Sequence, residues 1–225
     1  MTEVRAYGCK GKSRAWAGWA GHIVSGFFDN AEAFGKAADA LEAAKAPGIY
    51  FTINPVIPEI LAQCKNRLRA AGDGDCTSDR HTLVLRWLYI DIDPIRPGRL
   101  KISTTAEELR AAVIIRDRIA DWMEQEMHWH PGIRAHSGNG VHLHYRLPDF
   151  KNDVEGDGVN VRRIKDCLEA LHEKFTNKWA EVDLKMFNPS RICKLYGTTA
   201  RKGDHTKERP HRKSYIEQSN DKPMS

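Results

Sequence analysis

The order of the apolar patterns in the second half of the chain limits the fold more than any other feature. Four stretches rich in alternating apolar, β-branched and aromatic residues predict strands, and they lie at 82–93, 133–137, 141–147 and within 180–198. Two longer stretches repeat their apolar residues at helical spacing, at 103–129 and 159–179. The expected order is therefore strand, helix, strand, strand, helix, strand.

This order predicts an α+β fold, because it is typical of a ferredoxin-like or RRM-like sheet. We expect three parts. Residues 1–80 carry shorter patterns and form an additional N-terminal α/β module, residues 81–212 hold the RRM-like module, and residues 213–225 form a polar C-terminal tail. In the first part we expect a helix at 30–46, capped by Asn30, and a second helix at 58–70 that opens at a proline.

The composition suits a single large domain with a small elaboration. The chain has 225 residues, of which 41% are hydrophobic, and a formal net charge of +5, which suits a partner that carries phosphates. Five cysteines form no CxxC pair, so neither a zinc knuckle nor a disulfide framework is indicated. The N-terminus lacks a signal-like apolar segment and no run is long enough to cross a membrane, so we expect a cytoplasmic protein without a membrane partner.

The strand at 82–93 ends in two acids, in the sequence RWLYIDIDP. Side chains alternate along a strand, so Asp91 and Asp93 point to the same face, about 7 Å apart. Two carboxylates so placed repel each other, and a hard cation such as Mg²⁺ or Mn²⁺ between them removes the repulsion. Two solvated acids before the turn at Pro94 are the alternative. A third ligand would favour the metal, and Asp183 in the apolar segment EVDLKMF is the best candidate.

The predicted hairpin carries the turn SGNGVH at residues 137–142. Glycines let backbone N–H groups approach a phosphate, and Ser137 and His142 can both donate hydrogen bonds to its oxygens. Taken alone, the turn is equally typical of a plain β-hairpin, because Asn-Gly is a favoured hairpin dipeptide.

A basic segment follows, with Arg191, Lys194, Arg201 and Lys202. Guanidinium and ammonium groups suit a triphosphate or a nucleic-acid backbone, although charge alone is equally compatible with a solvated surface. An acidic pair, a phosphate-binding turn and a basic segment in this order indicate a nucleotidyl-transfer site. Two-metal chemistry needs carboxylates to hold both ions and a triphosphate to bridge them.

With these motifs the chain resembles the archaeo-eukaryotic primase superfamily, the primase-polymerases, and most closely its bacterial, plasmid, phage and CRISPR-associated members. The D-h-D, S-G-x-G-x-H and h-D motifs of that family correspond to YIDIDP, SGNGVH and the VD that ends at Asp183. NPSRICKLYGT, with RKGD and ERPHR after it, and the earlier GIYFTINP also look like family segments. The likeness covers residues 4–212.

The resemblance implies that Asp91, Asp93 and Asp183 are catalytic and hold two divalent ions, Mg²⁺ or Mn²⁺. It implies nucleotide binding by Ser137, Gly140, His142, Asn188, Arg191, Lys194, Lys202, Tyr50 and Asn54. It also places Arg96 near the template or the nucleotide.

The implied activity is that of a DNA primase-polymerase. On a single-stranded DNA template it would start primers or extend them, by attack of a 3′-hydroxyl on the α-phosphate of a nucleoside triphosphate. A helicase or a CRISPR protein, encoded separately or on the same longer chain, is a further implied partner.

Two other functions remain open from the sequence. His142 and His144 form the histidine-hydrophobic-histidine core of HUH nicking endonucleases and replication initiators, in which a tyrosine such as Tyr196 or Tyr215 would attack DNA. That interpretation gives the three aspartates no joint role. A non-catalytic nucleic-acid-binding module is the other alternative.

Overall fold

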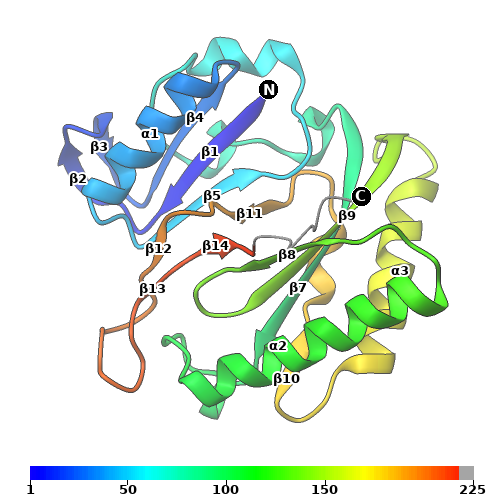
Figure 1. Cartoon of the computed structure of the whole chain (residues 1–225). Helices are drawn as coiled ribbons and strands as arrows, with labels where there is room; N and C mark the ends of the chain where they lie inside the picture. Colours follow the sequence, from blue (N-terminus) through cyan, green and yellow to red (C-terminus); the bar gives the residue numbers. More distant parts are fainter. Residues whose placement is uncertain (218–225) are drawn as a thin grey trace, which may run out of the picture.

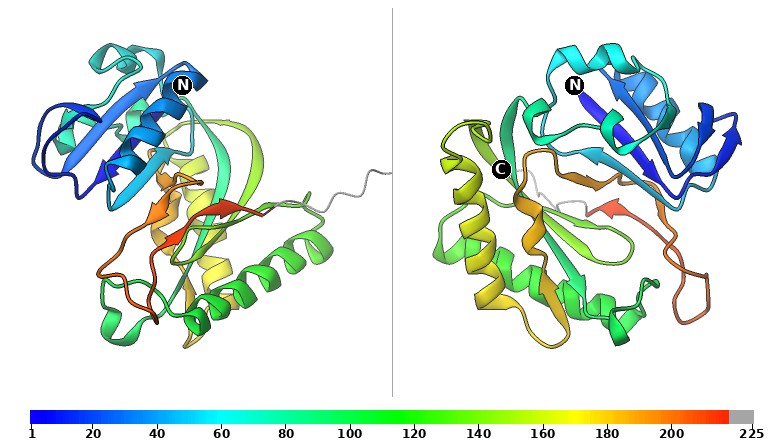
Figure 2. Two further views of the ribbon diagram at one scale, coloured as in Figure 1. Left: turned by 60° about the vertical axis from the view of Figure 1, so that its left-hand side comes forward. Right: turned by 180° about the vertical axis from the view of Figure 1, so that it is seen from behind.

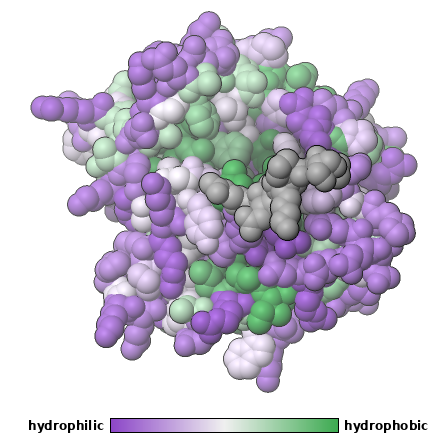
Figure 3. Space-filling model, viewed as in Figure 1, coloured by the Kyte–Doolittle hydropathy of each residue, from purple (hydrophilic) through white to green (hydrophobic). Residues whose placement is uncertain are grey.

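The computed structural model describes residues 1–217 and folds them into two main β-sheets with three α-helices (Figure 1). The first sheet uses mainly N-terminal strands and lies at the top of Figure 1, and the second lies below it. On the face seen in Figure 3, hydrophilic residues cover most of the surface. Among the described residues, no helix is both long enough and apolar enough to cross a membrane.

The second sheet follows the predicted order of elements. Its members are β7 (Val84–Pro94), α2 (Ala106–Asp121), β8 (Ile133–His136), β9 (Val141–Lys151), α3 (Val159–Phe175) and β10 (Ala180–Val182). With β14 (Tyr215–Ile216) as a fifth strand, the strands lie in the order β10-β7-β9-β8-β14 with antiparallel neighbours. The expected mixed α+β class and the sequence of strands and helices are thus confirmed.

Both long helices pack on the same face of this sheet. Ile90 and Ile92 of β7 are fully buried in one core with Ile115 of α2 and Leu168 of α3. Because side chains alternate along β7, the opposite face of the strand is left to Tyr89, Asp91 and Asp93. The helices therefore fill one side of the sheet and leave its other side for the site.

Local sequence fixes where these helices begin and end. Thr105 and Glu108 form a reciprocal capping box at the start of α2. The predicted helix at 103–129 ends earlier, because α2 stops at Asp121 and passes into one π-helical turn at Trp122–Glu126. The predicted helix at 159–179 likewise ends four residues early as α3.

The first sheet has seven strands in the order β11-β5-β1-β4-β6-β3-β2. These are β1 (Thr2–Tyr7), β2 (Gly11–Ser13), β3 (Trp16–Ala20), β4 (Ile23–Phe28), β5 (Gly48–Thr52), β6 (Arg69–Ala71) and β11 (Ile192–Lys194). Asn30 caps α1 (Ala31–Ala43) as predicted, and α1 packs through Leu41 on this sheet. The seventh strand, β11, comes from the far end of the sequence.

Two expectations about local structure are wrong. The helix expected at 58–70 is only a 3₁₀ helix at Pro58–Gln63, since Arg69–Ala71 instead pairs with β4. Residues 212–217 are not a free tail either, because β13 (Arg212–Lys213) pairs with β12 (Thr199–Ala200) and β14 (Tyr215–Ile216) extends the second sheet beside β8 (Figure 2). The rest of the expected tail, 218–225, lies outside the described residues.

The two sheets meet through a small apolar cluster. Ile53 after β5 and Cys193 of β11 pack on Tyr89 of β7. Strand pairing therefore crosses the expected module boundary at residue 80, because β11 completes a sheet that otherwise consists of strands before it.

Candidate metal and phosphate site

The two aspartates of β7 lie together on the face of the second sheet that the helices leave uncovered. The side chain of Asp91 is 18% exposed and that of Asp93 is 37% exposed. Asp183 follows β10 directly, and its backbone N–H donates to the carbonyl oxygen of Asp91 at 2.9 Å. The structure thus brings the three predicted ligands to one end of neighbouring strands.

The surroundings of the aspartates disfavour their charged form. Burial, followed by the repulsion of the Asp183 carboxylate, raises the pKa of Asp91 to about 7. Burial and the charge of Asp91 raise the pKa of Asp93 to about 6. Arg96 offsets part of this charge through a 3.4 Å contact between its Nη2 and Oδ1 of Asp93. Oxygen donors with excess charge are the set that Mg²⁺ and Mn²⁺ prefer, so the chemistry of these residues suits such ions. Among the described residues, however, the three aspartates do not form a group whose ligand atoms all lie within 4.8 Å of one another.

The SGNG turn lies directly against the acidic pair. Ser137 Oγ accepts from the backbone N–H of Gly140 at 2.9 Å, which closes the turn. A Cβ at Gly140 would lie 2.7 Å from the carbonyl oxygen of Ile92 and 2.9 Å from Oδ1 of Asp93. Only glycine allows this approach, and the turn is therefore held within reach of anything bound by the carboxylates.

His142 connects the turn to the acidic pair. Its Nε2 lies 3.4 Å from Oδ1 of Asp91 and 3.1 Å from the hydroxyl of Tyr89, while its Nδ1 lies 2.6 Å from the hydroxyl of Tyr196. Burial lowers the pKa of His142 to about 3, so the ring is neutral at physiological pH. When Asp91 is ionised it can only accept, and the ring can then donate from Nε2 and accept the Tyr196 proton at Nδ1.

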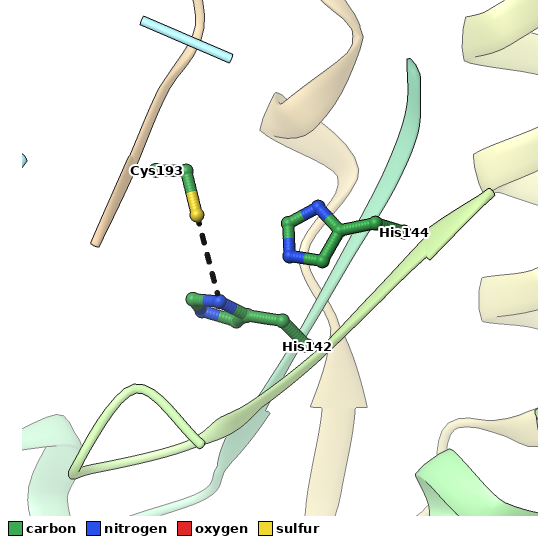
Figure 4. A group of neighbouring side chains, drawn as sticks. All are labelled: His142, His144 and Cys193. Atoms are coloured by element: carbon green, nitrogen blue, oxygen red, sulfur yellow. Dashed lines mark hydrogen bonds between the residues drawn. The ribbon is translucent and has the colours of Figure 1, made fainter. Parts of the chain in front are cut away.

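His142, His144 and Cys193 form a second group of possible ligands (Figure 4). One nitrogen from each histidine and the cysteine sulfur all lie within 4.8 Å of one another, and all three residues are buried. Two nitrogens and a thiolate suit a borderline ion such as Zn²⁺. However, the Tyr196 hydroxyl lies 2.6 Å and 2.5 Å from the two histidines and accepts from the cysteine at 3.4 Å. A hydrogen-bond network already fills the centre of the group.

A cavity of about 690 Å³ opens over the acidic pair. Predicted site residues that line it are Tyr50, Asp91, Asp93, Ser137, His142, Arg191, Lys194 and Lys202, together with Arg96. Burial lowers the pKa of Lys194 to about 8, and its Nζ lies over the Tyr50 ring at 5.8 Å. With Lys101 and Arg201, six lysine and arginine side chains line the cavity together with the two aspartates.

Four predicted site residues do not line this cavity: Gly140 and Asp183, which lie beside the acidic pair as described above, and Asn54 and Asn188. The Asn54 amide donates to the carbonyl of Pro189 and accepts from the N–H of Arg86, and the residue lines a different cavity. Asn188 donates to Asp79 and to the hydroxyl of Ser190. In this structure both asparagines hold the chain around the site.

Sequence reasoning missed several residues of the site. Tyr7 and His22 line the cavity from the N-terminal sheet, and the Tyr196 hydroxyl is a hydrogen-bond partner of His142. Tyr7 and His22 stand in no motif, because they reach the cavity only through the pairing of β1 with β4 and β5. The sequence does indicate Tyr196, but as the nucleophile of a nicking enzyme.

In comparisons with known proteins, no family model matches the chain and no curated protein matches it significantly.

Proposed function

We propose that this chain is a metal-dependent nucleotidyltransferase, a DNA primase-polymerase of the archaeo-eukaryotic primase superfamily. One observation carries the proposal: two aspartates, a serine and a histidine of the glycine turn, and a group of cations, all predicted from separate sequence motifs, line one cavity. Asp183 lies beside Asp91, to which its backbone is hydrogen-bonded. The strand order of the second sheet, with its two helices on one face, supports a ferredoxin-like or RRM-like palm.

The aspartates are the groups that would hold two divalent ions. When bound, such ions lower the pKa of the attacking 3′-hydroxyl and neutralise the pyrophosphate that leaves. The protein contributes a rigid position for them, because Asp91 and Asp93 alternate with buried isoleucines in the central part of the sheet.

The other residues bind and orient the triphosphate. Ser137 and the Nε2–H of His142 donate to phosphate oxygens, and Arg191, Lys194 and Lys202 neutralise its charge. Tyr50 offers its ring to the sugar or base. In-line attack on the α-phosphate then requires only that primer and nucleotide be held in this geometry.

A primer-extension assay tests the proposal. With single-stranded template, labelled nucleotides and Mg²⁺ or Mn²⁺, with and without a primer, wild-type protein is expected to incorporate nucleotides and Asp91→Ala to lose the activity while keeping its fold. Asp166→Ala is the matched control, since Asp166 is exposed on α3. Undiminished extension by Asp91→Ala would refute the proposal.

The second candidate is an HUH-type nicking enzyme, which the closeness of His142, His144 and Tyr196 favours. That function needs a reactive tyrosine. Burial raises the pKa of Tyr196 far above its ordinary value, which keeps the hydroxyl protonated. The aspartates also stay without a role, so we favour the polymerase.

A further inference from the structure

The hairpin of β2 and β3 carries positive charge that no acid among residues 1–217 pairs with. From Tyr7 to His22 the sequence contains Lys10, Lys12 and Arg14 but no acid. All three cations are exposed. Within residues 1–217, no ion pair involves them. A local charge of +3 at the edge of a sheet attracts an anionic partner.

The same hairpin exposes a large aromatic ring. Trp19 is 71% exposed, whereas Ala20 beside it is buried and Trp16 packs on the core. The neighbours Ala17 and Gly18 are small and exposed, so they leave the indole uncovered. The hairpin that carries it forms one edge of the N-terminal sheet, with β2 as the outermost strand (Figure 1). An open ring among cations is the usual platform for a stacked nucleobase.

The hairpin leads into the cavity of the site. The turn that joins β3 to β4 ends at His22, which lines the cavity together with Tyr7 and Tyr50. The rings of His22 and Tyr7 lie 5.8 Å apart, and those of Tyr7 and Tyr50 lie 5.9 Å apart. The hairpin is thus followed directly in the chain by one of three neighbouring aromatic side chains that line the cavity.

We propose that the β2–β3 hairpin binds single-stranded DNA and guides the template to the cavity, with Trp19 stacked on a base and Lys12 and Arg14 on phosphates. The template role rests on the proposed function; the binding of single strands does not. A protein partner fits the surface less well, because protein interfaces have an apolar centre that is poor in charge, whereas here one ring stands among three cations.

Binding of a fluorescent single-stranded oligonucleotide tests the proposal. Trp19→Ala is expected to weaken binding about tenfold, within the range known for the loss of one stacked base. The double variant Lys12→Ala/Arg14→Ala is expected to make the dependence of log Kd on log salt shallower by about 1.4, since each phosphate contact on a single strand contributes about 0.7. Both changes lie on the surface, and equal melting temperatures check that the fold is kept.

Trp179→Ala is the matched control. Trp179 is 61% exposed with Lys178 over its ring at 4.9 Å, but it lies in the turn between α3 and β10 of the other sheet. Its removal should leave the Kd unchanged. An unchanged Kd for Trp19→Ala, an equal loss for Trp179→Ala, or tighter binding to vesicles of anionic lipid than to DNA each overturns the proposal.

Primer extension by wild type, Asp91→Ala and Trp19→Ala distinguishes a failure of this proposal from a failure of the proposed function. If wild type and Asp91→Ala both fail to extend primers but bind DNA through Trp19, the polymerase proposal is refuted and the proposal for the hairpin is supported. If primers are extended with the same template KM in Trp19→Ala as in wild type, the hairpin fails and the polymerase stands.

Discussion

Gly140 sets the distance between the phosphate-binding turn and the acidic pair. A methyl group there would lie 2.7 Å from a backbone oxygen of β7, which no side-chain rotation relieves. Gly140→Ala is therefore expected to lower the free energy of unfolding by about 1–3 kcal/mol and to reduce primer extension, since Asp93 or the turn must shift. Denaturant unfolding and the extension assay measure the two effects.

Gly35→Ala is the control for this substitution. A Cβ at Gly35 meets nothing within 4 Å, and the residue lies inside α1. Its replacement should raise stability by up to about 1 kcal/mol and leave extension unchanged. A Gly140→Ala protein as stable and active as Gly35→Ala would show that the turn does not touch the pair.

The Tyr196 hydroxyl is a hydrogen-bond partner of both His142 and His144. Tyr196→Phe leaves buried nitrogens of His142 and His144 without their partner, so we expect a loss of about 1–3 kcal/mol in stability together with a lower kcat. Tyr215→Phe is the matched change, because Tyr215 is half exposed and stacks on His136 through its ring. It should affect neither quantity. If the protein forms a covalent adduct with DNA and either substitution abolishes that adduct, the result would instead support the nicking enzyme.

At the scale of elements, α1 holds the basic loop that faces the site. Glu42 accepts from the backbone N–H and hydroxyl of Thr199, at 3.0 and 2.6 Å, and from the guanidinium of Arg201 at 2.7 Å. Burial opposes ionisation of Glu42, but the hydrogen bonds and the charge of Arg201 prevail and lower its pKa from 4.5 to about 2. The loop that carries Lys202 is thus fixed to a helix of the other sheet.

This contact makes the stability of the protein depend on pH. Since the folded-state pKa of Glu42 is depressed, its contribution is fully present above pH 4.5 and is lost as the pH falls toward 2. Glu42→Gln should therefore be less stable than wild type at pH 7, with a difference that shrinks below pH 4.5. Denaturant unfolding at several pH values measures it, and a difference that stays constant with pH contradicts the assignment.

The elements of the second sheet could be predicted because each is a long segment with a clear period. Its two long helices and central strands were expected within a few residues, apart from early helix ends. Two short strands were not: β6 has three residues, and its pairing with β4 outweighs the helical pattern of 58–70. Likewise, β14 is a strand only because β8 offers it a free edge.

At the scale of the whole molecule, the three motifs of the site could be predicted from the sequence, but the cavity and the residues that line it could not. The three aspartates, Ser137 and His142 were found from residue type and spacing. Asn54 and Asn188 were carried over from a resemblance, and the structure uses their amides within the fold. The spacing of apolar residues in the sequence does not predict that β5 and β11 would pack on β7.

This meeting makes the two sheets depend on each other. Expressed alone, residues 1–80 should fail to unfold cooperatively, because they lack β11 and the cluster around Tyr89. The full chain should show one transition in urea by circular dichroism and by tryptophan fluorescence. A cooperative transition for residues 1–80 alone, or two separate transitions for the full chain, would show that the sheets are independent.

The late origin of β11 also has a consequence for synthesis. At about 5–20 residues per second, a ribosome needs roughly seven to thirty seconds between finishing β5 and finishing its partner at Lys194. During that interval the apolar strand GIYFT has no partner on one side in the nascent chain. The growing polypeptide therefore passes through a stage in which that edge is open to pairing with a strand of another chain.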